Sequence, residues 1–196
     1  GAATRPCAGC SRVGAVLFED NDTSLSGAAS EGSANLVRLL LARGSDPLRS
    51  DQQRETALTV ASRRCHRDVL RALLDWVRVR DARTAAAMLE HADNDGWTAL
   101  RSAARGGHGE AVRLLLDAGA DVDGAYDGHS ALSAALLEGH GEVAELLMRR
   151  GADTDVRDAE GRPLLYLLVL EGRCAAGVGP RRWSASRRRS APAPTG

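Results

Sequence analysis

The sequence repeats itself at a nearly constant interval, and this constrains its fold more than any other feature. Each repeat begins at a Thr, Ser or Pro that is followed two residues later by a leucine. These starting residues are Thr23, Thr56, Thr98, Ser130 and Pro163. These starts are almost evenly spaced, except for a longer interval between Thr56 and Thr98. A fixed period of roughly 20–50 residues is typical of repeat proteins, in which stacking of neighbouring units creates the core.

The residue pattern of each repeat unit predicts two helices. With 43% hydrophobic and only 3% aromatic residues, the core must consist mainly of Leu, Ala and Val, which favours helices over a β-sandwich. We expect the Thr or Ser at a repeat start to cap a first helix that carries a small Ala pair, such as Ala103 and Ala104. A second helix then carries Val and Leu at i, i+3 and i+4, and a glycine such as Gly119 ends it.

This pattern resembles the ankyrin repeat, whose units read roughly as Thr-x-Leu, a small Ala pair, Gly-His, a Val/Leu run and Gly-Ala-Asp. The resemblance covers residues 18–173 and implies an all-α ankyrin-repeat solenoid of stacked helix–turn–helix units with hairpin-like connecting loops. The units fall at about 18–50, 51–92, 93–124, 125–157 and, in part, 158–173. Within the family, residues 93–108 and 158–172 are most similar to the repeats of a member that has a long array.

The second unit departs from the pattern. Val77 stands where the glycine that ends the second helix is expected, and the interval from Thr56 to the next start, Thr98, is longer than the others. We therefore predict an insertion over residues 76–92, in which a lengthened helix or an extra helical turn near 83–90 protrudes from the stack. A loop insertion is favoured over a dedicated binding element. The same unit has Arg54 where a turn glycine is expected.

The two ends of the chain differ from the array. Residues 1–17 are predicted to form a disordered leader and residues 174–196 a disordered tail. All 26 basic residues are arginine, and six of them follow Gly172 without any acidic residue, so the tail is strongly basic and the body is acidic. The fifth unit stops midway and the chain begins with Gly, which suggests a fragment of a longer array.

No residue pattern predicts an active site, a metal site or a cofactor. Cys7 and Cys10 form a C-x-x-C, but a structural zinc needs four ligands and no second pair follows at a suitable spacing. The resemblance implies that His108 and His140, in the Gly-His position, bond to loop backbone. No nucleophile signature accompanies them, so we expect the protein not to be an enzyme.

The partner of such an array is expected on its concave face, which consists of the loop tips and one side of each first helix. The resemblance implies that this surface binds another protein. The residue before each start projects at a tip, and the fourth and eighth residues of each unit share a helix face. The candidate partner-binding residues are Arg63, Trp97, Arg101, Arg105, His129 and Tyr166.

Trp97 beside Arg101 and Arg105 is the leading candidate, because Trp and Arg are common at binding hot spots. Arginine grips carboxylates in bidentate fashion, so the predicted partner is an acidic or extended protein segment. The alternative is that Trp97 packs on its own hairpin and both arginines are solvated.

The basic tail offers a second function. Its arginines could bind nucleic acid or an acidic surface, although a tail without specific function is favoured. They are Arg181, Arg182, Arg187, Arg188 and Arg189. The leading hypothesis remains a scaffold or adaptor module, monomeric and without a membrane span, in the cytoplasm or else in the nucleus. A nuclear or nucleic-acid-associated factor is the alternative.

Overall fold

The computed structural model describes residues 21–78, 82–124 and 129–155, and within these ranges all of the regular structure is helical. An isolated antiparallel bridge joins Ser50 to Thr56. The helices are α2 (Asn21–Ser30), α3 (Ala34–Ala42), α4 (Ala57–Arg64), α5 (Arg67–Arg78), α6 (Ala82–Leu89), α7 (Ala99–Arg105), α8 (Gly109–Asp117), α9 (Ala131–Leu137) and α10 (Gly141–Arg149).

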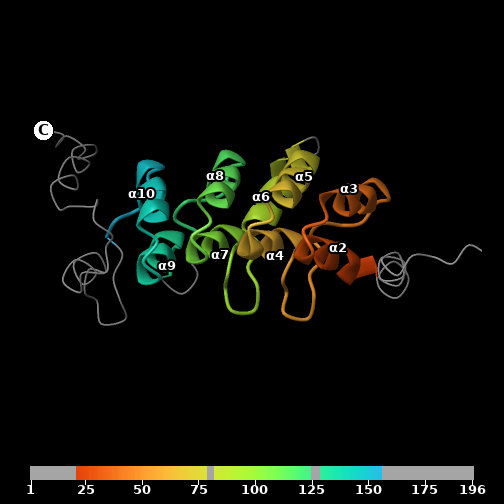
Figure 1. Cartoon of the computed structure of the whole chain (residues 1–196), viewed down its shortest axis with the longest axis horizontal. Helices are drawn as coiled ribbons and strands as arrows, with labels where there is room; N and C mark the ends of the chain where they lie inside the picture. The colour runs from red at the N-terminus through yellow and green to blue at the C-terminus, as the bar shows by residue number, and fades with distance from the viewer. Residues whose placement is uncertain (1–20, 79–81, 125–128, 156–196) are drawn as a thin grey trace, which may run out of the picture.

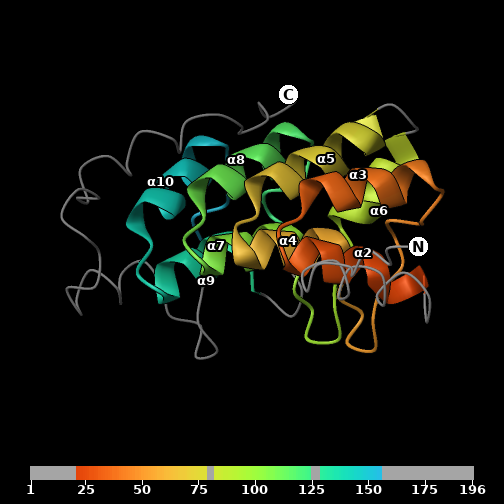
Figure 2. The ribbon, with the colours of Figure 1, turned by 45° about the vertical axis from the view of Figure 1, so that its right-hand side comes forward.

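The helices form two parallel rows. The first helices of the units, α2, α4, α7 and α9, line up in one row, and the second helices, α3, α5, α8 and α10, line up above them (Figures 1 and 2). The loops before α4 and α7 extend beyond the row of first helices (Figure 1). This arrangement confirms the predicted all-α solenoid and creates one surface from the first helices and loop tips, which we call the concave face.

Each described first helix from α4 onward begins with the predicted side-chain cap. The side-chain oxygens of Thr56, Thr98 and Ser130 accept from the backbone N–H three residues later, at 3.3 Å in each case. These bonds satisfy N–H groups that lack a partner inside the helix. The first unit differs, because α2 begins at Asn21 and Thr23 lies inside the helix.

The second helices supply leucine and valine to the core and end at glycine as predicted. Gly44, Gly119 and Gly151 have φ of 91°, 97° and 97°. Next to Gly119, the N–H of Ala120 donates to the carbonyl of Leu115 at 3.0 Å, and equivalent bonds occur after Gly44 and Gly151. This left-handed cap satisfies carbonyls at the helix end and turns the chain back toward the next unit.

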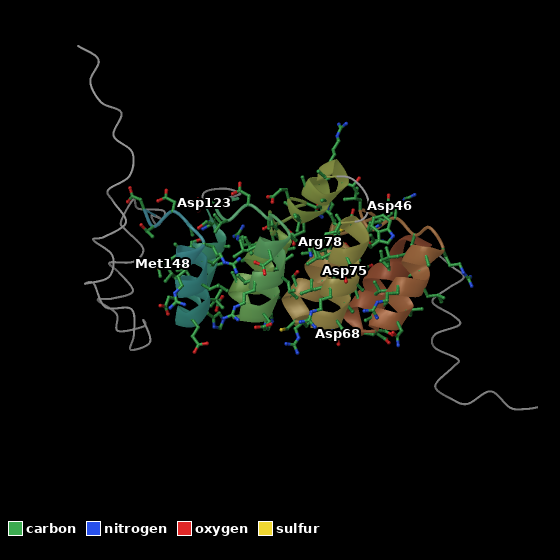
Figure 3. The ribbon with its side chains drawn as sticks, turned by 90° about the horizontal axis from the view of Figure 1, so that it is seen from above. Asp46, Asp68, Asp75, Arg78, Asp123 and Met148 are labelled. Carbon is green, nitrogen blue, oxygen red and sulfur yellow. The ribbon has the colours of Figure 1, made fainter. Side chains whose placement is uncertain are left out.

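The insertion is a packed helix. Without a stop glycine, α5 extends over 12 residues, whereas α3, α8 and α10 have nine each. A separate helix, α6, follows and extends past the row of second helices (Figure 3). Its Met88 and Leu89 are only 1% and 3% exposed within the core. The prediction of added helix is confirmed, but α6 is anchored through its last turn.

Candidate functional site

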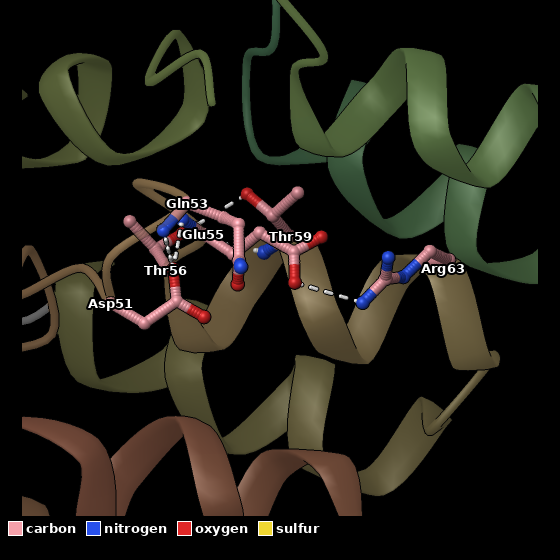
Figure 4. Close-up of polar contacts among 6 residues, drawn as sticks. All are labelled: Asp51, Gln53, Glu55, Thr56, Thr59 and Arg63. Atoms are coloured by element: carbon pink, nitrogen blue, oxygen red, sulfur yellow. Dashed lines mark hydrogen bonds and ion pairs between the residues drawn. The ribbon is translucent and has the colours of Figure 1, made fainter. Parts of the chain in front are cut away.

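The hairpin before α7 fixes Trp97 at its tip. The Oδ1 atom of Asp93 accepts from the backbone N–H of Asp95 at 2.9 Å and of Trp97 at 2.8 Å. The N–H of Asp93 in turn donates to the carbonyl of Trp97 at 3.2 Å. Asp51 makes the same pair of side-chain bonds in the preceding hairpin, to Gln53 and Glu55 (Figure 4). Trp97 is therefore held by its backbone while its half-buried ring lies on the concave face.

Two arginines from α7 lie over the Trp97 ring. The Cζ atom of Arg101 is 3.8 Å from the ring centroid and that of Arg105 is 4.9 Å from it. Both distances are within the range of cation–π attraction, which contributes about 0.5–2 kcal/mol depending on exposure. The predicted grouping of Trp97 with Arg101 and Arg105 is thus present as a stacked cluster.

Arg101 is nevertheless not an exposed binding residue. It is only 8% exposed, and its Nη1 donates to the carbonyl of Gly96 at 3.1 Å. The equivalent residues of neighbouring units, Thr59 and Ser133, are buried too. The expectation that fourth residues face a partner was wrong, because Thr59 and Ser133 bond back to the capping residues of their helices and Arg101 bonds back to the hairpin. At this position Arg101 replaces the Thr or Ser of the neighbouring units, and its guanidinium group lies beneath the Trp97 ring.

The eighth residues of the units do form an exposed row. Arg63, Arg105 and Leu137 follow one another along the first helices, and Leu137 is 45% exposed. Both arginines already contact carboxylates. Arg63 donates to Glu55 at 2.8 Å (Figure 4), and Arg105 donates to Glu138, at the end of α9, at 3.2 Å. These pairs leave little unpaired positive charge on the face.

Two adjacent hollows lie on the concave face beside Trp97. The larger, of about 400 Å³, includes Glu55, Arg63, Asp93, Asp95, Arg105 and Glu138 in its lining. The smaller, of about 240 Å³, includes His129, Ala134 and Leu137. Trp97, Arg105 and Glu138 border both, so the two hollows share an edge. His129 is exposed beside the smaller hollow, whereas Tyr166 and the tail arginines 181–189 lie outside the described residues.

The carboxylates are what the sequence reasoning missed. Glu138 follows Leu137 directly and lies one repeat after Arg105 along the chain. Residues one repeat apart stack on one another in a solenoid, and this spacing was the available signal. Asp93 holds the hairpin turn, and both Asp93 and Asp95 contribute negative charge to the larger hollow.

The histidines join neighbouring units. His108 and His140 were predicted to bond to loop backbone, but they bond to carbonyls at the ends of helices in the preceding unit. The Nε2 atom of His108 donates to the carbonyl of Arg63 at 2.9 Å, and that of His140 to the carbonyl of Arg105 at 2.8 Å. His66 makes the equivalent bond to Ser30 at 3.0 Å. These imidazoles satisfy carbonyls at the ends of first helices, which is a structural use.

Two further properties concern only the described residues. No group of three or more His, Cys, Asp or Glu side chains is placed there to hold a metal ion. None of the helices in this part combines the length and apolar character needed to cross a membrane. Cys7 and Cys10 lie outside these residues.

The family model for "Ankyrin repeats (3 copies)" matches residues 9–85 and 77–158 of this chain. Among curated proteins, the chain is similar to the B-cell lymphoma 3 protein homolog of Mus musculus, with 38% identity over 89 residues. It is also similar to the transient receptor potential cation channel subfamily A member 1 homolog of Caenorhabditis elegans, with 33% identity over 106 residues. A third relative is the ankyrin repeat and KH domain-containing protein mask-1 of C. elegans, 34% identical over 103 residues.

These matches cover 45%, 54% and 52% of this chain but only 19%, 8% and 4% of the respective relatives. The likeness is therefore to the repeat arrays within much longer proteins. The finer prediction, that the array is most similar to that of ankyrin repeat domain-containing protein 50, stays a prediction.

Proposed function

The chain belongs to the ankyrin-repeat family, and from this premise we propose that it is a non-enzymatic module that binds another protein across its concave face. The observation that carries the proposal is the half-buried Trp97 ring between two hollows. A rigidly held aromatic side chain beside an exposed leucine matches the composition of binding hot spots, where a few residues supply most of the affinity. The family match supports the same reading, because ankyrin repeats generally bind proteins.

The absence of catalytic activity is part of the proposal. His66, His108 and His140 all donate to backbone carbonyls, so their Nε2 atoms hold the units together. These three nitrogens are therefore not available as bases for a nucleophilic side chain, as catalysis by a dyad would need. The hollows are open to solvent and lined by several charged side chains, which suits a protein partner.

An extended segment of the partner fits this surface. The two hollows run along the row of first helices and are joined at Trp97. The expectation of an acidic segment rested on arginines that were free to bind carboxylates of the partner. Because Arg63 and Arg105 contact carboxylates of their own chain and Arg101 is buried, that reason is removed.

We propose further that the chain acts as a scaffold or adaptor within a larger protein. The much greater length of its relatives supports this. The monomeric state and a location in the cytoplasm stay predictions. The alternative function, nucleic-acid binding by the arginine tail, falls on residues outside the described ranges and also stays a prediction.

The test is a comparison of proteins captured from cell extract by matched variants of the full chain. Trp97→Ala and Leu137→Asp change the concave face, and Arg113→Ala changes the exposed side of α8 as a control. We expect one set of proteins to be retained by the wild type and Arg113→Ala but lost from both face variants. Circular dichroism checks that each variant is folded.

Capture of the same proteins by all of these variants would exclude the concave face as the binding surface. A further variant tests the alternative function, nucleic-acid binding by the tail. In this variant, Gln replaces Arg181, Arg182, Arg187, Arg188 and Arg189. Nucleic acid recovered with the native tail and lost with the Gln variant would favour the tail function.

A further inference from the structure

The larger hollow has an excess of negative charge that its own arginines do not balance. It is lined by the carboxylates of Glu55, Asp93, Asp95 and Glu138 and by two guanidinium groups, those of Arg63 and Arg105. With all of these groups ionised, the lining carries a net charge of about −2. A surface of this kind attracts cations and repels anionic groups.

The excess resides on the hairpin that positions Trp97. Arg63 is paired with Glu55, whose side chain is only 14% exposed, and Arg105 is paired with Glu138. Asp93 uses one oxygen, Oδ1, for its two backbone N–H bonds. Asp95 is exposed at the hairpin tip, and neither aspartate is within ion-pair distance of an arginine in the described structure. Two carboxylates are thus presented beside the Trp97 ring.

The smaller hollow adds an apolar contact at the other side of Trp97. Leu137 is 45% exposed and lies with Ala134 and His129 along this hollow. A large exposed leucine beside a half-buried tryptophan is the kind of surface that a partner's apolar side chain covers. Since Trp97, Arg105 and Glu138 border both hollows, the acidic and apolar contacts are neighbours.

We infer that the concave face binds an extended segment of a partner protein in which a lysine or arginine enters the larger hollow and a neighbouring apolar side chain covers Leu137. Side chains at i and i+2 of an extended chain point to the same side, so one short segment can supply both. The inference rests on the proposed function and adds the chemistry of the partner. Charge complementarity, together with the adjacent apolar contact, selects this occupant.

The test is selection of peptides from a random library displayed on phage, using the full chain as the target. We expect the enriched peptides to carry Lys or Arg close to an apolar residue and to lose binding to Trp97→Ala. Synthetic copies then give dissociation constants. Asp93→Asn with Asp95→Asn removes the excess charge and retains the Oδ1 acceptor of the hairpin.

This double variant should weaken binding about fivefold, because each exposed charge pair contributes only modestly to affinity. The matched control is Asp68→Asn with Asp75→Asn, which changes net charge equally on α5 and should leave the affinity unchanged (Figure 3). Equal weakening by both double variants would overturn the inference, because it would reflect net charge alone.

The remaining outcomes separate this inference from the proposed function. Peptides that depend on Trp97 but are enriched in Asp or Glu would overturn the cationic partner and leave the binding face in place. If no selected peptide depends on Trp97 or Leu137, both proposals fail. Tenfold tighter binding after the tail arginines 181–189 are changed to Gln would identify the chain's own tail as the occupant and overturn the inference.

Discussion

The guanidinium carbon of Arg101 lies 3.8 Å from the centre of the Trp97 ring, and the same group donates to the carbonyl of Gly96 at 3.1 Å. One buried side chain therefore links the first turn of α7 to the hairpin that precedes it. This explains how a loop tip can present an aromatic ring in a fixed position. Arg101 is buried beneath the Trp97 ring and holds it in place, so Trp97, and not Arg101, is available to a partner.

Removal of Arg101 should therefore reduce stability. Arg101→Ala is expected to lower the free energy of unfolding by about 2 kcal/mol, through loss of the cation–π contact and of a charge-assisted hydrogen bond. Urea denaturation followed by circular dichroism measures the change. Arg113→Ala, at an exposed site on α8, should cost less than about 0.5 kcal/mol. Equal stability of the two variants would show that the Arg101 contacts contribute nothing.

A double-mutant cycle isolates the contact itself. Trp97→Ala, Arg101→Ala and the double variant should give a coupling free energy of about 0.5–2 kcal/mol. The same cycle for Arg105 and Glu138 should give about 0.2–1 kcal/mol, because both side chains are about half exposed. A larger coupling for the second pair would contradict the relative burial described above.

The repeat period made most of the array predictable. Thr56, Thr98 and Ser130 cap their helices and Gly44 ends one, because a backbone requirement at a fixed offset recurs in every unit. The site was less predictable. The burial of Arg101 depends on how a helix start packs on its own hairpin, and Glu138 reaches Arg105 only through the stacking of two units. The Arg101 contact lies within one unit but depends on tertiary packing, whereas the Arg105–Glu138 contact joins two units.

Gly107 provides a test of how closely the units approach one another. Its φ is +70°, and an added Cβ would lie 2.7 Å from the His140 ring of the next unit. Gly107→Ala should therefore cost more than about 2 kcal/mol, combining left-handed strain with displacement of a histidine that bonds to Arg105. Gly44→Ala is the control, because it has φ +91° with no atom within 4 Å of the added carbon. Denaturant unfolding that shows equal costs would mean that the contact with His140 is unimportant.

Two residues in the second unit occupy backbone positions that suit glycine. Arg54 and Cys65 both have φ of 60°, whereas the equivalent residues Gly96 and Gly107 have φ of 72° and 70°. Arg54→Gly and Cys65→Gly should each stabilise the protein by about 0.5–1 kcal/mol, the relief of strain exceeding the entropy gained by the unfolded chain. Thermal unfolding measures this as a higher midpoint. A lower midpoint for both variants would contradict the left-handed conformation.

The last prediction concerns α6, the helix in the insertion, and its contribution to the stability of the stack. If α6 is a component of the core, Met88→Ala should lower the free energy of unfolding by about 2–4 kcal/mol, because Met88 is 1% exposed. Ala86→Ser, on the exposed side of the same helix, changes helix propensity slightly and should cost less than about 0.5 kcal/mol. Urea denaturation of both variants distinguishes a packed helix from a tolerated loop. If Met88→Ala costs no more than Ala86→Ser, α6 detaches from α5 in solution and contributes no stability to the stack.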